Sequence, residues 1–422
     1  DENYSKDTPS ELYIKHFKVA GQGTVGLQFH AKERFQIVLN CDKKSSCGEK
    51  DVIVLDVGKE VTYFRKRNNN DESSILKSTV ERKALLDDKK VQLYWLSLDK
   101  KNRRLRYGKG PMQNQLTVFS YDFPQKVPQK KSQEIEDYKW IENLKYIAVC
   151  CKSISKDDFE GEKPTIKVLF WRLPVTMDLP PFIIRHEDAT LEELETGKVT
   201  VIDNLPKKCQ ELYWNVVDIT LNTPDFPDFA DAIDHSIKTP GLICNKKLKE
   251  KASGFGDPNP KATYLRITLG EDKGNSPGVP YVLEIWPSGH YSPIHSHSNS
   301  FAVIKVLYNE IVTRYFAGLD PEEKKWYYQV SFQEGEITWI SDKFYQTHQL
   351  VNRTRKMCAT IQCYQYRNSD NDHYEFFDYI DKKDGIKHFK PNSDWHFTEF
   401  KNLIKEEWKQ YKYISDCDLS VR

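Results

Sequence analysis

The feature that most constrains this chain is the alternation of apolar and polar side chains with a period of two residues. It recurs between about residue 14 and residue 122, and polar turns separate the runs. Successive side chains on a strand point to opposite faces, so this pattern predicts half-buried β-strands. Short strands at this spacing are typical of a β-sandwich. The expected strands cover residues 17–19, 25–29, 35–39, 52–55, 61–64, 91–98 and 116–121.

The length of 422 residues exceeds that of one typical domain. Further apolar runs at 146–151 and 166–171 extend the sandwich pattern, and prolines then interrupt any regular element at Pro174, Pro180 and Pro181. We therefore expect a β-sandwich over residues 1–178 and a second domain over residues 179–422.

Helical signals open and close the second domain. Thr190 and Glu193 have the spacing of a capping box, and a helical region with breaks is expected over residues 212–248. The strand pattern returns at residue 262 and continues to about 366. Near the end, apolar side chains share one helical face, which predicts a helix docked on the domain: Phe400, Leu403, Ile404, Trp408 and Tyr411. The fold class expected for the whole chain is mainly β.

Composition argues against two classes of partner. The net charge is +1, so there is no bulk electrostatic attraction to nucleic acid or to an anionic membrane. No apolar stretch approaches the ~18 residues that a membrane span requires. We expect neither nucleic acid nor a membrane span.

The cysteines and the start of the sequence bear on whether the protein is extracellular or cytoplasmic. A first residue other than Met, Asp1, is found in mature secreted chains and also in chains shortened for other reasons. The spacing of Cys41 and Cys47 allows a disulfide, and two free thiols are an equal alternative. Asn3 and Asn352 lie in glycosylation sequons, the second in an enclosed position. An extracellular location is expected over a cytoplasmic one.

Histidines in the segment YVLEIWPSGHYSPIHSHSNSF, residues 281–301, are the strongest chemical signal. His295 and His297 are two residues apart, so on a strand both side chains reach the same side of the sheet. His348 follows another strand-like run at 335–340 and is the natural third ligand. A lone pair of this kind is more often surface chemistry, and neutral imidazole suits iron, zinc, copper and nickel alike.

The spacing around these histidines resembles the two motifs of the cupins. Gly289 lies five intervening residues before His295, and three residues separate His348 from Asn352. Most cupins place a glutamate shortly after the His-x-His pair, and no carboxylate follows here. The resemblance implies a jelly-roll barrel with a three-histidine site, with Fe(II) as the expected metal and another divalent transition metal as the alternative.

Within the cupins, residues from about 190 to 400 resemble the cysteine dioxygenases. The similar residues include Tyr264-Leu265-Arg266, Trp286, the segment 294–300, Lys305, Leu307 and the segment around His348. The resemblance implies that Arg266, supported by Tyr264, holds the carboxylate of a small thiol acid. The sulfur of that substrate would be oxidised by O2 to a sulfinate.

Three positions depart from the cysteine dioxygenase pattern. Ala302 stands where animal members have a cysteine that is crosslinked to a tyrosine, so no thioether can form. Direct counting puts Gln365 at the place of that tyrosine and Cys363 at the place of a histidine two residues before it. A slip of one residue would make Tyr366 the phenol, because Tyr364 and Tyr366 share a strand face.

The first half of the chain has a resemblance of its own. The blocks HFKVA, FQIVL, YFR, YWLS, YGKG and KYIAV, between residues 16 and 149, are similar to the farnesoic acid O-methyltransferase-like domain. That family is a β-sandwich of invertebrate recognition proteins, which implies a carbohydrate or protein ligand. No glycine-rich nucleotide loop follows a strand here.

Three functions remain open at this point. The first is an iron-dependent thiol dioxygenase. The second is a secreted binding or structural protein whose cupin has lost or changed its dioxygenase activity. The third is an enzyme that acts on a different substrate, such as a small carboxylate or phenol. The ligands and Arg266 favour the first, whereas the three departures and the partner domain favour the second.

Overall fold

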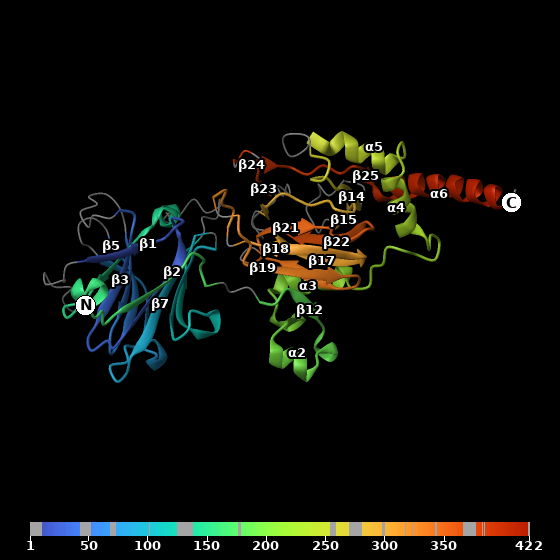
Figure 1. The fold of residues 1–422 in the computed structure, drawn as a ribbon. Helices are drawn as coiled ribbons and strands as arrows, with labels where there is room; N and C mark the ends of the chain where they lie inside the picture. The colour runs from blue at the N-terminus through green and yellow to red at the C-terminus, as the bar shows by residue number, and fades with distance from the viewer. Residues whose placement is uncertain are drawn as a thin grey trace, which may run out of the picture. The chain divides into compact units, whose positions relative to one another are not determined.

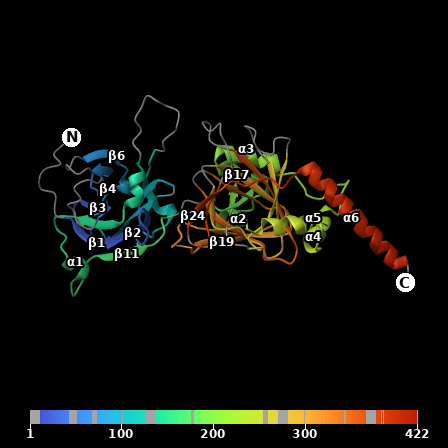
Figure 2. The same cartoon turned by 90° about the horizontal axis from the view of Figure 1, so that it is seen from above.

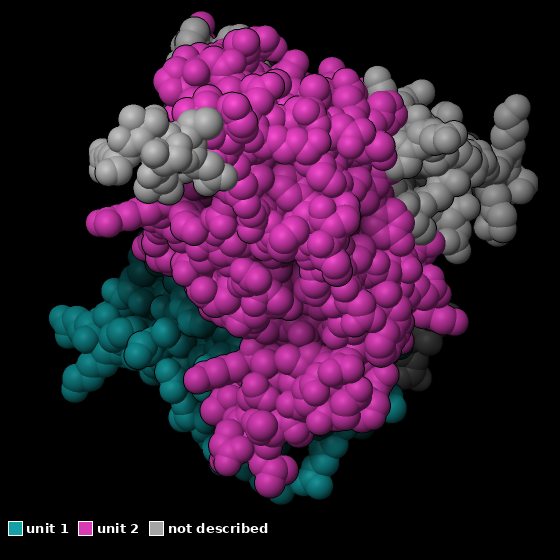
Figure 3. All heavy atoms as spheres, turned by 90° about the vertical axis from the view of Figure 1, so that its right-hand side faces the viewer, with its two compact units in different colours: residues 1–177 teal, residues 178–422 magenta. Residues whose placement is uncertain are grey.

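The computed structural model describes residues 11–42, 52–67, 73–100, 102–124, 138–175, 179–253, 259–269, 281–297, 300–316, 318–322, 324–341, 344–365, 377–381, 383 and 385–420. The chain forms two compact units, residues 1–177 and 178–422, which are coloured separately in Figure 3. The boundary between the units follows residue 177, one residue before the boundary expected from the prolines, which followed residue 178.

The first unit is a sandwich of two antiparallel sheets (Figure 1). One sheet has the order β1-β10-β3-β4-β5-β6 and the other β11-β2-β7-β8-β9. The strands are β1 (Leu12–His16), β2 (Gln22–Phe29), β3 (Phe35–Asn40), β4 (Val52–Val57), β5 (Thr62–Arg67), β6 (Ser73–Thr79), β7 (Gln92–Asp99), β8 (Arg104–Lys109), β9 (Thr117–Asp122), β10 (Tyr146–Cys150) and β11 (Lys167–Trp171). One short helix, α1 (Asp157–Glu160), precedes β11.

Alternating side chains from both sheets form the core of the sandwich. Val25 and Leu27 on β2 pack with Ile37 and Leu39 on β3, and all four are fully buried. The expectation of a β-sandwich is therefore confirmed. One expected strand is wrong, because β1 ends at His16 and Val19 makes only an isolated bridge. Cys47, the partner in the disulfide considered above, lies outside the described residues, as does Asn3.

The second unit contains a barrel of two facing sheets. One has the order β20-β17-β22-β15-β14-β25 and the other β19-β18-β21-β16-β23-β24. All neighbours are antiparallel except β14 and β25. The strands are β14 (Leu265–Leu269), β15 (Tyr281–Trp286), β16 (His295–His297), β17 (Phe301–Tyr308), β18 (Glu310–Tyr315), β19 (Tyr328–Gln333), β20 (Ile337–Ile340), β21 (Thr347–Val351), β22 (Cys358–Gln365), β23 (Phe377–Ile380), β24 (Ile386–Phe389) and β25 (Trp395–His396).

Helices cover the outside of the barrel and include the elements expected from the sequence. They are α2 (Leu191–Thr196), α3 (Lys207–Val216), α4 (Phe229–Lys238), α5 (Ile243–Glu250) and α6 (Phe397–Ser420). The capping box of Thr190 and Glu193 is present at the start of α2. In Figure 1, α3 lies against the sheet that contains β17 and β22. A small parallel sheet of β12 (Phe182–Ile184) and β13 (Val199–Val201) precedes α3.

Short 3-10 helices connect several of these elements. They lie at Arg82–Ala84, Asn114–Leu116, Tyr138–Asn143, His186–Asp188, Ile202–Asn204 and Lys251–Ser253.

The C-terminal helix docks through its first half. Phe400 and Ile404 are fully buried in the main core of the second unit, and Trp408 packs against that core. Leu403 and Tyr411, which were expected on the same face, are 37% and 44% exposed. Figure 2 shows α6 running out past α4 and α5, which explains why residues 409–414 are exposed. Within the described residues, no helix combines the length and apolarity needed to cross a membrane.

Candidate metal centre

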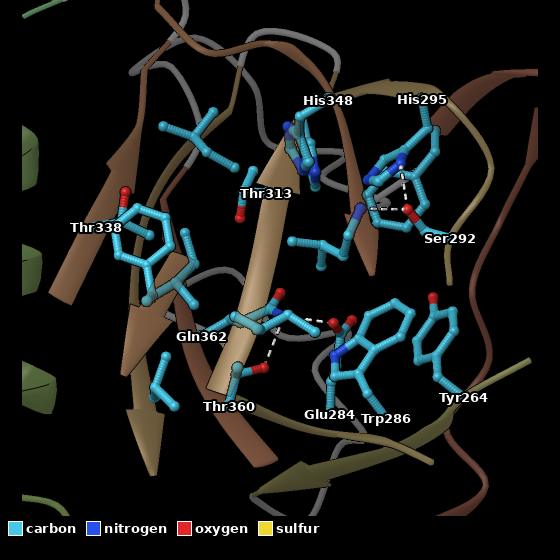
Figure 4. Close-up of a pocket in the computed structure, with 18 of the residues that line it drawn as sticks. Tyr264, Glu284, Trp286, Ser292, His295, Thr313, Thr338, His348, Thr360 and Gln362 are labelled. Carbon is cyan, nitrogen blue, oxygen red and sulfur yellow. Dashed lines mark hydrogen bonds between the residues drawn. The ribbon is translucent and has the colours of Figure 1, made fainter. Parts of the chain in front are cut away.

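Two neighbouring strands bring the three histidines together inside the barrel. His295 and His297 are alternate residues of β16, and the antiparallel register places His295 directly opposite His348 on β21. One ring nitrogen from each side chain lies within 4.8 Å of the other two. The side chains of His295 and His348 point toward the same space in Figure 4. The arrangement expected from the spacing is therefore present.

Backbone carbonyls orient two of the imidazoles. The Nδ1 atoms of His295 and His348 lie 3.0 Å from the carbonyl oxygens of Pro293 and Tyr345. A carbonyl only accepts, so each Nδ1 carries the proton, and Nε2 is left with the lone pair that binds a metal. Burial lowers the pKa of His295 to about 4 and that of His348 to about 3. Both rings are neutral at neutral pH, as metal ligands must be.

The donor set fits a transition metal ion. Buried neutral imidazoles at this spacing suit Fe(II), Zn(II), Cu(II) and Ni(II). Among the described residues, no carboxylate or thiol joins the histidines in a metal-binding group. Three protein ligands leave coordination positions for small molecules, as catalytic metal sites require. The side chains alone do not select one metal.

A cavity adjoins the histidines, and its walls come from both sheets. Water can reach about 60 Å³ of it, which is room for roughly five water-sized groups. Most of the lining is apolar or aromatic, including Phe377 on β23, whose ring centroid is 4.5 Å from that of His297. Besides the histidines, the polar lining residues are Glu284, Ser292, Thr313, Thr338, Thr360 and Gln362.

Arg266 is engaged by a carboxylate of this chain. It lies on β14 directly opposite Glu284 on β15. Its Nη1 donates to Glu284 Oε1 at 3.0 Å, and both side chains are 5% exposed. Glu284 lines the cavity, whereas Arg266 is not among the lining residues. The structure thus places Glu284 between the cavity and the arginine expected to hold a substrate carboxylate.

Tyr264, the other residue expected to support the substrate, forms part of the cavity wall. Its ring stacks on Trp286 with centroids 4.3 Å apart and an interplanar angle of 18°. Lys251, which does not line the cavity, places its Nζ 5.2 Å from the centre of the Tyr264 ring. The two rings form an aromatic wall below the histidines in Figure 4.

Of the tyrosines near the position expected for the phenol, Tyr364 faces the interior of the barrel. It lies directly opposite Ala302 across β17 and β22, it lines the cavity, and its ring centroid is 6.0 Å from that of His297. The register is thus one residue earlier than direct counting gave. Tyr366, the phenol considered above, lies outside the described residues.

The same register assigns the neighbours of Tyr364. Gln362 takes the interior position two residues before Tyr364, which in the cysteine dioxygenases that the sequence resembles is a histidine. Cys363 is on the outer face, where Asn215 on α3 donates to its sulfur at 3.7 Å. With Ala302 opposite Tyr364, no sulfur is available for a crosslink there. Asn352 is fully buried and donates to the carbonyl oxygen of Trp286, which makes its sequon inaccessible in the fold.

Comparisons with known proteins add little to this geometry. Neither models of protein families nor curated protein sequences match the chain. Partly similar solved structures include an oxalate oxidase bound to the substrate analogue glycolate (18% identity, 26% of this chain, 54% of that chain, TM-score 0.22). Another is the cupin domain of Cnp3 from Schizosaccharomyces pombe (9% identity, 26% of this chain, 68% of that chain, TM-score 0.21). A third is a cupin-superfamily sugar phosphate isomerase from Silicibacter pomeroyi (16% identity, 26% of this chain, 67% of that chain, TM-score 0.19). The match spans about half of the oxalate oxidase chain.

The fold is decided by the strands and the histidines of this chain. Two facing sheets enclose a His-x-His pair on one strand and a third histidine on its neighbour. The C-terminal unit has the two-sheet barrel fold of the cupins. The TM-scores are too low to add to that conclusion.

Glu284 and Gln362 were not predicted from the sequence as lining the site. A signal for Glu284 was present, because it is the one charged residue in the otherwise apolar strand YVLEIW. A charge at a buried strand position needs a partner, and Arg266 was available. Gln362 carried no comparable signal, since glutamine is common on strand surfaces as well.

Proposed function

We propose that the C-terminal unit binds Fe(II) through His295, His297 and His348 and oxidises a small thiol to a sulfinate. The observation that carries the proposal is the convergence of three buried imidazoles beside an enclosed aromatic cavity, with no carboxylate from the described residues in the metal-binding group. A thiol and O2 both need coordination positions, and a three-histidine set leaves them available.

The reaction balances without a further reductant. Both atoms of one O2 pass to the sulfur of one thiol, and sulfur loses as many electrons as dioxygen gains. Bound Fe(II) would favour the thiolate over the thiol and mediate the electron exchange with dioxygen.

The chain's own groups orient the ligands and exclude water. Pro293 and Tyr345 fix two of the imidazoles through their carbonyl oxygens. Trp286, Tyr264 and Phe377 line the cavity with aromatic rings, which limits the water around a bound thiolate. Tyr364 donates its hydroxyl proton to Gln362 Oε1, so toward a ligand its oxygen acts as an acceptor.

Metal content tests the first half of the proposal. After loading with Fe(II) under anaerobic conditions, the purified protein is expected to hold about one iron per chain. Inductively coupled plasma mass spectrometry would measure the iron content. His297→Ala should weaken the binding of iron by at least about 100-fold. That loss exceeds the loss expected from removing a residue that only hydrogen-bonds to a metal ligand. His290→Ala is the matched control, because His290 bonds to the carbonyl of Thr263 and lies outside the metal group. Equal iron in both variants would contradict the assignment.

Oxygen consumption tests the second half. The iron-loaded protein should take up O2 with at least one of cysteine, 3-mercaptopropionate and 2-mercaptoethanol, and the sulfinate product should be detected by mass spectrometry. Bound iron without uptake on any thiol would sink the dioxygenase and leave the metal site intact.

A second candidate is favoured by the surroundings of the cavity. Glu284 engages Arg266, and Gln362 lines the cavity at the position where the cysteine dioxygenases that the sequence resembles have a histidine. These changes suit a barrel that has kept a metal and given up thiol oxidation. In that case the sandwich, with a carbohydrate or protein ligand, would carry the function of an extracellular binding protein.

A further inference from the structure

The wall of the cavity nearest Arg266 presents a carboxylate, not a cation. Glu284 lines the cavity, and one of its oxygens accepts from Arg266 at 3.0 Å. The two side chains are equally buried at 5% exposed. Glu284 and Arg266 together carry no net charge, and the negative member is the one that a ligand meets.

Neighbouring side chains hold Glu284 in this position. Gln362 Nε2 donates to its second oxygen, Oε2, and lies 3.5 Å from Thr360 Oγ1. Tyr364 in turn donates to Gln362 Oε1. The dashed bonds of Figure 4 show Glu284, Gln362 and Thr360 joined on one side of the cavity. Because both carboxylate oxygens are engaged, turning Glu284 away would break several buried hydrogen bonds at once.

This arrangement disfavours an anionic ligand. A carboxylate that enters the cavity meets another carboxylate in a poorly hydrated space, where like charges repel strongly. The guanidinium behind Glu284 is already committed to it. An ammonium group is attracted to the same carboxylate, but the guanidinium of Arg266 behind it offsets part of that attraction, and the lost hydration of the cation is not repaid.

Buried donors in the lining residues suit an uncharged polar ligand. Trp286 Nε1, Trp339 Nε1 and Thr338 Oγ1 all belong to lining residues and have no hydrogen-bond partner in the described part of the chain. Buried polar atoms are normally paired, so a ligand with a neutral oxygen would complete them. An indole N–H donates only, so the matching ligand atom is an acceptor such as a hydroxyl or carbonyl oxygen.

We infer that the cavity selects small uncharged thiols and that Glu284 is the residue that excludes carboxylates. The inference rests on the proposed function for the contact between sulfur and metal, and it narrows the substrate class from thiols in general to neutral ones. It replaces the thiol acid implied by the resemblance with a hydroxy-thiol or similar molecule.

Ligand titrations of the Co(II)-loaded protein test this without turnover. Thiolate binding to Co(II) changes the visible absorption spectrum, which gives a dissociation constant for each thiol under anaerobic conditions. The probes are three small thiols that differ in the group at the end opposite the sulfur. This group is an uncharged hydroxyl in 2-mercaptoethanol, a carboxylate in 3-mercaptopropionate and an ammonium in 2-aminoethanethiol. We expect 2-mercaptoethanol to bind at least about tenfold more tightly than either charged thiol.

Glu284→Gln assigns the selectivity to one residue. The variant keeps the size of the side chain and an oxygen that can accept from Arg266, but it removes the negative charge. The affinity for 3-mercaptopropionate relative to 2-mercaptoethanol should rise at least about tenfold. Glu322→Gln removes the same charge from an exposed position of the same unit and should leave the ratio unchanged.

The possible outcomes separate the inference from the proposed function. Equal or tighter binding of either charged thiol by the wild-type protein would overturn the inference, whether or not Glu284→Gln folds. An unchanged ratio in a folded, Co(II)-binding Glu284→Gln variant would also overturn it. Selective binding of the neutral thiol with no oxygen uptake by the iron form would reject the dioxygenase and leave the inference standing.

Discussion

Lys305, one of the residues on which the sequence resemblance to the cysteine dioxygenases rested, has a structural role in this chain. It lies on β17, where even-numbered residues such as Ile304 and Val306 line the cavity. Lys305 therefore points to the outer face, where Nζ donates to the carbonyl oxygens of Val217 at 2.5 Å and Ile219 at 2.9 Å. Burial lowers its pKa from the ordinary value. The contact ties the end of α3 to the barrel, where a cation also suits the helix dipole.

Replacing Lys305 with methionine tests that role. Lys305→Met keeps most of the aliphatic stem and leaves two carbonyl oxygens without this donor. The free energy of unfolding should fall by about 1–3 kcal/mol, measured by urea denaturation, while metal content stays unchanged. Lys198→Met changes an exposed lysine and should have little effect. Loss of metal in Lys305→Met with normal stability would show a direct role at the site.

The histidines and Arg266 differ in how far the sequence could predict them. The position of His295 and His297 on one face follows from strand alternation alone, and the structure has it so. The pairing of Arg266 with Glu284 depends on the register of β14 against β15. Local spacing does not specify that register. The sequence therefore located the arginine but not its partner.

At the scale of elements, amphipathic strands were predictable and polar ones were not. β3 and β4 are fully buried along their length and carried clear apolar patterns. β6, Ser73–Thr79, lies at the edge of its sheet and is mainly polar and exposed, so no alternation of apolar residues marked it. β8 was missed because two of its alternate positions are Arg104 and Arg106, which are buried arginines.

The docking of α6 can be tested with two adjacent residues. Ile404 is fully buried in the main core, whereas Leu403 is 37% exposed. Ile404→Ala should lower the free energy of unfolding by about 2–5 kcal/mol, because it leaves a cavity in a packed core. Leu403→Ala should cost less than about 1 kcal/mol. Thermal and urea unfolding would measure both, and equal losses would mean that the helix packs on a different face.

On the scale of the whole molecule, each unit has a hydrophobic core of its own. The buried cluster of the sandwich draws only on residues of the first unit, and the main cluster of the barrel draws only on the second. The three histidines and every residue described as lining the cavity lie between Tyr264 and Tyr379. A domain with its own hydrophobic core can in principle fold alone.

We therefore expect residues 178–422, expressed alone, to fold and to bind metal as the whole chain does. The dissociation constant for Co(II) should agree within about twofold, because such a change is under 0.5 kcal/mol and no ligand is lost. A shorter fragment that ends at residue 396 is the matched control, since it lacks Phe400 and Ile404 and exposes the core that they cover. It should fail to unfold cooperatively. If residues 178–422 bound metal much more weakly than the whole chain while showing the same circular dichroism, the sandwich would have to contribute to the metal site.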